Sequence, residues 1–131
     1  MREQLTEKGH IDVIFASAGV GNLMEPFGTV TAESFDATFN VNVRGTLFIV
    51  QKALAFLRDH ASIILNGAAG SGGRGFPTIT VCAASKAALR SFARTWTSAL
   101  QDRKIRERAE PGRDRHGSTG LPAAGRAGDL C

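Results

Sequence analysis

The pattern of apolar and polar residues over the first hundred positions predicts two strands and two helices. Residues 11–16, IDVIFA, form a short apolar run that ends in the small residues SAGVG, which is typical of a buried strand entering a tight loop. A second short run, ASIIL at residues 61–65, precedes the glycine-rich segment NGAAGSGGRG. No apolar run reaches the ~18 residues of a membrane-spanning helix, so we expect no membrane segment.

Between the two predicted strands the apolar spacing changes to intervals of three and four, which predicts a helix over residues 31–60. Thr31 is a suitable N-cap for it. The positions that repeat at this spacing are Phe35, Phe39, Val43, Leu47, Val50, Leu54 and Leu57. The same spacing predicts a second helix over about residues 83–100. Strands that alternate with single helices indicate a parallel, right-handed α/β arrangement.

The last part of the chain differs in character. From Glu107 onward, the sequence ERAEPGRDRHGSTGLPAAGRAGDLC has no apolar periodicity and is built mainly from Arg, Ala, Gly, Pro and Asp. Such a composition predicts disorder. We therefore expect one partial α/β domain at residues 1–106 and a disordered tail at residues 107–131.

Charge and cysteine content exclude several classes of function. The net charge of +4 is spread along the chain, so there is no basic stripe and we expect no nucleic-acid partner. The two cysteines, Cys82 and Cys131, have neither a metal-binding spacing nor the pattern of a disulfide framework. We therefore expect no metal site and a reducing, cytoplasmic location.

A glycine motif follows the second predicted strand. Residues 70–75, GSGGRG, match the pattern G-x-G-x-x-G of dinucleotide-binding loops. That chemistry requires a helix to begin at once, so that its N-terminus meets the pyrophosphate, and here FPTITV intervenes. No acidic residue lies about twenty positions further on to hold a ribose. We interpret the motif as a glycine loop rather than a phosphate loop.

Four segments, taken in order, resemble the second half of the short-chain dehydrogenase/reductase family: IDVIFASAGVG, FNVNVRG, SIILNGAAGSGGRGF and SKAALRSFARTW. The resemblance covers about residues 8–106. It implies a partial, doubly wound, Rossmann-like parallel sheet whose two predicted strands are the fourth and fifth of the family's sheet. It also implies NAD- or NADP-dependent interconversion of alcohols and carbonyls.

The resemblance assigns roles to single residues. Ala18 and Gly19 match the end of the family's Asn-Asn-Ala-Gly loop, which lies near the cofactor. Asn42 matches the family's catalytic asparagine. Lys86 matches the lysine that binds the nicotinamide ribose and lowers the pKa of a tyrosine four residues earlier.

Two catalytic positions depart from the family pattern. Cys82 stands where the tyrosine would be, and a thiol is too short to bring a proton within the ~2.6–3.2 Å that proton transfer to a substrate requires. The family's serine falls on Ala68 or Ala69, neither of which can donate a hydrogen bond, and we disfavour the nearby Ser71 as its substitute. We therefore expect a truncated, catalytically silent relative, a pseudoenzyme, that does not bind NAD(P)H measurably, rather than an active oxidoreductase.

Two further hypotheses concern partners and the tail. The chain could instead be an interaction protein that pairs with a second copy or an intact relative through helices 31–60 and 83–100, because a core stripe and a dimer stripe look alike in sequence. In the tail, one codon choice for ERAEPGRDRHG spells VNALSPGGIDT in a shifted frame, which is similar to the family's continuation. We therefore expect residues 107–131 to be frame-shifted.

Overall fold

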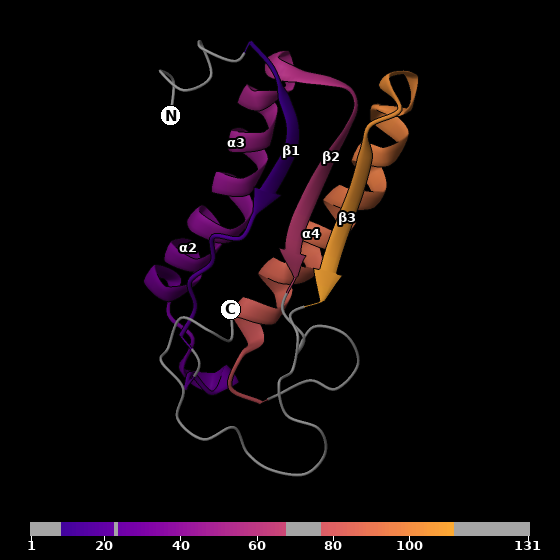
Figure 1. The fold of residues 1–131 in the computed structure, drawn as a ribbon. Helices are drawn as coiled ribbons and strands as arrows, with labels where there is room; N and C mark the ends of the chain where they lie inside the picture. Colours follow the sequence, from indigo (N-terminus) through magenta and orange to yellow (C-terminus); the bar gives the residue numbers. More distant parts are fainter. Residues whose placement is uncertain (1–8, 23, 68–76, 112–131) are drawn as a thin grey trace.

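The structure, a computed structural model, describes residues 9–22, 24–67 and 77–111 (Figure 1). Its strands are β1 (Ile11–Ala16), β2 (Leu57–Gly67) and β3 (Arg106–Pro111). Its longer helices are α2 (Ala32–Phe39), the π-helix η2 (Asn40–Gly45), α3 (Thr46–Ala53) and α4 (Thr80–Ala99). Three 3-10 turns complete the described elements: η1 (Phe27–Thr29), η3 (Leu54–Phe56) and η5 (Gln101–Arg103).

The strands form one parallel sheet in the order β1-β2-β3. The predicted strand at residues 11–16 is confirmed with the same bounds, and the parallel arrangement is confirmed as well. The helix predicted at residues 83–100 is α4, which begins three residues earlier, at Thr80. The architecture is therefore the partial Rossmann-like sheet that the sequence predicts.

The hydrophobic core lies on one face of this sheet. Along β2, alternate side chains are buried against the helices, because successive residues of a strand point to opposite faces. Val50 of α3 and Leu89 and Ala93 of α4 join Ile63 and Leu65 of β2 in a single buried cluster. Figure 1 shows α3 beside β1 and α4 beside β2 and β3, on the same side of the sheet. All the described helices that contribute to the core thus cover one face.

The opposite face of the sheet is open in the described structure. Val13 is 57 % and Phe15 61 % exposed, and both lie on the face of β1 that is turned away from the helices. Their neighbours across the ladder, Ser62 and Ile64 of β2, are only half-buried. Two large apolar side chains of an edge strand therefore meet solvent.

The helix predicted at residues 31–60 is wrong at its C-terminal end and in its continuity. Thr31 does cap α2, since its side chain accepts a 3.1 Å hydrogen bond from the backbone N–H of Ser34. The helix then changes to π-helical geometry over Asn40–Gly45 and ends with η3 at Phe56. Leu57 fits the helical spacing, but its backbone is extended and it pairs with Ile11 of β1.

The beginning of β2 explains why helical spacing is misleading there. The strand begins at Leu57 rather than at Ala61, and its register with β1 shifts between Ile11 and Val13. His60, which lies within this irregular part, has a positive φ of 66°. Leu57 is buried in the core from a strand, so its apolar character fits either structure, and pairing with β1 decides which one forms.

The predicted disordered tail is wrong for its first residues. Residues 107–111 belong to β3, which pairs with β2 from Ser62↔Arg106 to Gly67↔Pro111. A ladder is formed by backbone groups, so the mixed charges of this segment do not prevent pairing, and Pro111, which lacks an N–H, stands at its end. The described parallel sheet therefore extends to residue 111. Residues 112–131 lie outside the described residues, so their disorder and the shifted frame stay predictions.

Within the described ranges, no helix is both long and apolar enough to cross a bilayer. The same part of the chain has no group of three or more potential ligands arranged to hold a metal ion. The expected cytoplasmic location stays a prediction.

Candidate active site

Asn42 joins the loop after β1 to helix α4. Its side chain is fully buried, at 0 % exposed, in the π-helix η2. Oδ1 accepts a 2.8 Å hydrogen bond from the backbone N–H of Val20, and Nδ2 donates to the Val20 carbonyl, also at 2.8 Å. Nδ2 also donates to Ser85 Oγ at 2.9 Å. One amide group thus fixes the position of a loop residue relative to a helix that is 43 residues further along the chain.

The position of Asn42 in the π-helix turns its side-chain amide toward the loop after β1. Asn42 lies on the same buried stripe as Thr38, Thr46 and Val50, which recur every four residues. Asparagine is a poor helix former, because its side chain competes for backbone groups. Here those backbone groups belong to Val20 rather than to its own helix. A π-helical turn inside a longer helix is a feature that often accompanies functional sites.

Ser85 is a site residue that sequence reasoning missed. It is fully buried, accepts the bond from Asn42 and donates a 2.7 Å hydrogen bond to the backbone carbonyl of Cys82. The signal for it was its position next to Lys86 and three residues after Cys82, on one helix face. Without the fold, nothing in the sequence indicates that Asn42 faces it.

Lys86 is buried at the carboxyl end of β2. It is 0 % exposed, and its Nζ donates a 3.2 Å hydrogen bond to the backbone carbonyl of Asn66. The side chain of Asn66 in turn donates to Ser17 Oγ in the loop after β1, at 3.1 Å. Burial lowers the pKa of the Lys86 amine from its ordinary value, because desolvation disfavours the charged form.

These contacts bring several predicted site residues to one region. Lys86 and Cys82 lie on α4, one turn apart, and Cys82 is buried at 2 % exposed. Ala18 and Gly19 lie in the loop whose next residue, Val20, is held by Asn42. Ligands of open parallel α/β sheets bind at the carboxyl ends of the strands, which is where this loop and Asn66 lie. Ala68, Ala69, Ser71 and the glycine motif at 70–75 lie outside the described residues.

The chemistry of the cluster is that of a hydrogen-bond donor without a phenolic acid. An ammonium group has three N–H donors, and among the described residues one of those on Lys86 is used by Asn66, which leaves two for a ligand. Two adjacent hydroxyls, such as those of a ribose, fit this donor set. The chain contains no tyrosine, so no phenol can serve as the acid next to Lys86.

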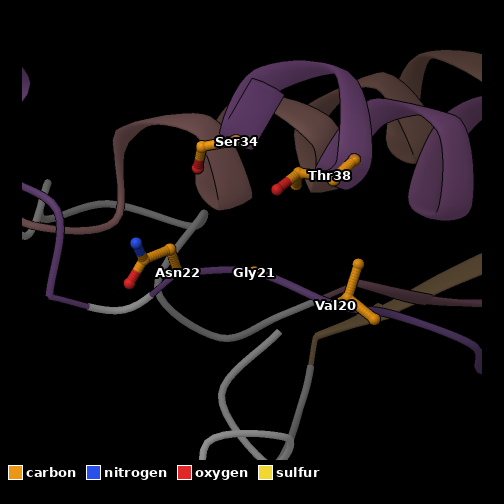
Figure 2. A pocket seen from close by; sticks show the side chains of 6 residues that line it. Val20, Gly21, Asn22, Ser34 and Thr38 are labelled. Carbon is orange, nitrogen blue, oxygen red and sulfur yellow. The ribbon is translucent and has the colours of Figure 1, made fainter. Parts of the chain in front are cut away.

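A hollow of about 350 Å³ lies beside the loop that Asn42 holds. Figure 2 shows it between the loop at residues 20–22 and the first turns of α2. Its lining consists of Val20, Gly21, Asn22, Ser34, Ala37 and Thr38. Val20 therefore belongs both to the wall of the hollow and to the Asn42 cluster.

The fold and the site define a class: a Rossmann-like α/β unit with a buried Asn–Ser–Lys cluster at the carboxyl ends of parallel strands. A family model described as Enoyl-(Acyl carrier protein) reductase matches residues 1–109. The chain belongs to the short-chain dehydrogenase/reductase family.

Curated relatives and a solved structure agree with this membership. The chain is 42 % identical over 102 residues to an oxidoreductase, asL5, of Sarocladium schorii. It is 35 % identical over 104 residues to a hydroxynaphthalene reductase-like protein, Arp2, of Metarhizium brunneum. These matches take in 76 % and 79 % of this chain but 40 % and 39 % of the relatives, so it spans about two fifths of their length. The crystal structure of the angucycline C-6 ketoreductase LanV with bound NADP is similar to 84 % of this chain and 44 % of that one, with a TM-score of 0.76 and 31 % identity.

Proposed function

We propose that this chain carries the cofactor-ribose and proton-relay region of an NAD(P)-dependent carbonyl–alcohol oxidoreductase, and that in this form it does not transfer hydride. One observation supports both parts of the proposal. The buried Asn42–Ser85 contact and the buried Lys86 keep the framework of such a site, whereas Cys82 stands one helical turn before Lys86, in place of a phenol.

The residues of the cluster have distinct tasks in this proposal. A nicotinamide cofactor, when bound, supplies or accepts the hydride. Lys86 would hold the ribose hydroxyls through its two remaining N–H groups. Asn42 and Ser85 would keep the loop after β1 at a fixed distance from α4. None of these groups protonates a carbonyl oxygen in the way that a phenol of lowered pKa does.

Cys82 accounts for the loss of catalysis in this proposal. A general acid has to come within about 2.6–3.2 Å of the atom that it protonates. The Cys82 side chain is short, 2 % exposed and disulfide-bonded, so it does not extend toward a ligand as a tyrosine side chain would. The expected result is a site that keeps the framework of the family's relay but neither holds the cofactor measurably nor turns a substrate over.

The experiment is an assay of NADPH oxidation with a fused-ring aromatic ketone, run beside an intact short-chain reductase as positive control. We expect no turnover above a protein-free blank, with NADH as well as with NADPH. A separate titration follows cofactor fluorescence, for which we expect no saturable change. Turnover would contradict the silent state, while saturable binding without turnover would contradict only the expected weakness of cofactor binding.

The class of substrate follows from the relatives. The name hydroxynaphthalene reductase-like protein describes a fused arene that bears hydroxyl groups, and LanV is named as a ketoreductase. We extend the proposal to the substrate class: the active ancestors of this site acted on hydroxylated, fused-ring carbonyl compounds.

A second candidate function is interaction with another subunit, and the surface of α2, η2 and α3 favours it. Phe35, Phe48 and Ile49 are each 44 % exposed, and Phe35 stacks on Phe39 with 4.4 Å between ring centroids. The exposed side chains of α4 are polar or small, so this helix offers less to a partner. Analytical ultracentrifugation of the Phe48→Ser variant, with Arg94→Ser as control, tests this surface. We expect the first substitution to weaken association and the second to leave it unchanged.

A further inference from the structure

The hollow beside α2 contains a buried hydroxyl that has no hydrogen-bond partner among the described residues. Thr38 is 2 % exposed, and Figure 2 shows its oxygen turned toward the space between α2 and the loop at residues 20–22. Two other helical threonines, Thr95 and Thr97, donate to the carbonyl four residues earlier, at 3.0 and 2.8 Å. Within the described residues, the Thr38 hydroxyl makes no such bond. A buried hydroxyl without a partner costs stability, so this arrangement indicates a ligand contact.

Ser34 presents the complementary half of the same contact. It lies one turn before Thr38, so both hydroxyls are on one face of α2. Its Oγ donates a 2.7 Å hydrogen bond to Glu25 Oε2, which uses the only proton of the hydroxyl. Toward the hollow, Ser34 therefore offers lone pairs and accepts hydrogen bonds. A ligand at this point has to donate.

Glu25 limits the charge of the ligand. Glu25 is buried, at 8 % exposed, and its carboxylate accepts the hydrogen bond from Ser34. Among the described residues, no basic side chain forms an ion pair with it; the described ion pairs all involve Asp12 or Asp59. A carboxylate without a basic partner among the described residues repels phosphate and carboxylate groups. The hollow is thus unsuited to a cofactor phosphate and suited to a neutral donor.

The remaining walls are apolar or without side chains. Val20 and Ala37 supply methyl groups, and Gly21 leaves the backbone of the loop uncovered. The position of Val20 is fixed by the two hydrogen bonds from Asn42, so this wall is held in place before a ligand arrives. A volume of about 350 Å³ lies at the lower end of the range for small-molecule sites and suits one or two rings.

We propose that this hollow binds a neutral arene through a phenolic hydroxyl, which donates to Ser34 and accepts from Thr38. This inference rests on the proposed function for its link to substrates, because it places the hydroxyl-bearing ring of such a substrate in the hollow. The contact itself requires no cofactor. Its test is therefore run without NAD(P)H, and the hydride-transfer assay does not affect its outcome.

The experiment compares two ligands that differ in one proton. The whole chain is titrated with 2-naphthol and with 2-methoxynaphthalene, which keeps the rings and the oxygen but cannot donate a hydrogen bond. Calorimetry gives the affinities. In NMR spectra, a shift of the backbone amide resonance of Gly21 reports that the ligand binds in the hollow. We expect 2-naphthol to bind about tenfold more tightly, which is the effect of one hydrogen bond to the half-buried Ser34 acceptor. Equal affinities, or no shift at Gly21, would overturn the proposal on the unmodified chain.

Substitutions then assign the contact to its residues. Ser34→Ala should reduce the preference for 2-naphthol to about threefold or less, because it removes the acceptor of the phenolic proton. Thr38→Val should weaken both ligands by a similar factor, because the ether oxygen of 2-methoxynaphthalene can also accept from Thr38. Thr97→Val, at a helical threonine outside the hollow, should change neither the affinities nor the preference. Sodium 2-naphthoate, a negatively charged analogue, should bind at least tenfold more weakly than 2-naphthol. A preference that persists in Ser34→Ala, unchanged affinities in Thr38→Val, or tight binding of the naphthoate would contradict the assigned contacts.

Discussion

The side-chain amide of Asn42 donates a 2.9 Å hydrogen bond to the hydroxyl of Ser85, and both side chains are fully buried. This contact ties the π-helix to α4, while the same amide holds Val20. Asn42 thus acts as a positioning residue for the loop that enters the site. The relationship has a direct consequence for stability, because every polar atom of the amide has a protein partner.

The Asn42→Ala variant should be less stable by about 2–3 kcal/mol, because it removes the partner of the part-buried N–H and carbonyl of Val20 and the donor to the buried Ser85 hydroxyl. Urea denaturation measures this loss. Hydrogen exchange gives a sharper test, since the Val20 N–H should lose its protection before the rest of the protein unfolds. Asn40→Ala, a substitution at an exposed position of the same π-helix, is the control. If both variants lose equal stability, the clamp is not the cause.

Burial of Lys86 predicts a particular dependence of stability on pH. A lowered pKa in the folded state means that the unfolded state binds the proton more tightly. The free energy of unfolding should therefore rise as the pH increases from the folded-state pKa of Lys86 toward its ordinary value of 10.5. Each pKa unit of difference is worth about 1.4 kcal/mol.

The Lys86→Met variant should lose this rise, because methionine has no proton to release. Urea denaturation at a series of pH values from neutral to alkaline, compared with Lys52→Met on the exposed surface of α3, measures it. A rise of the same size in Lys86→Met and in the unchanged protein would assign the effect to other groups.

The open face of the sheet predicts self-association. Phe15, at 61 % exposed, and Val13 beside it leave apolar area in water on an edge strand. Phe15→Thr keeps a residue suited to strands and removes the ring, so it should reduce association at micromolar concentration with a change in stability below about 1 kcal/mol. Light scattering over a concentration series measures this. Unchanged association would contradict a role of this sheet face and would assign self-association to the surface of α2, η2 and α3 instead.

Arg103 supports the turn between η3 and β2. Its guanidinium contacts Asp59 Oδ1 at 3.3 Å and the Leu54 carbonyl at 3.0 Å, and it also donates to the Leu57 carbonyl. Lysine has a single ammonium group in place of the fork-shaped guanidinium, so it cannot reach all three of these acceptors at once. Arg103→Lys should therefore cost about 1–2 kcal/mol of stability, whereas the exposed Arg58→Lys should cost little. Thermal denaturation of both variants checks the difference.

The sequence by itself determined the elements whose pattern is local. The apolar run at residues 11–16 and the spacing of α4 predicted those elements closely, and Thr31 was correctly chosen as a cap, because a cap depends on its own three following residues. The order of motifs also determined the family. The replacement of the family's tyrosine by Cys82 is also evident from the sequence alone.

The tertiary structure decided what depends on distant partners. Leu57 fits a helix by spacing and a strand by pairing, and only its neighbour Ile11 selects the strand. Residues 107–111 look unsuited to order, yet the free edge of β2 supplies the backbone partners that make them β3. Asn42, Ser85 and the hollow at Thr38 emerge only when segments 20 or more residues apart are brought together. Hydrogen bonds between such segments have no period in the sequence, so composition and spacing cannot reveal them.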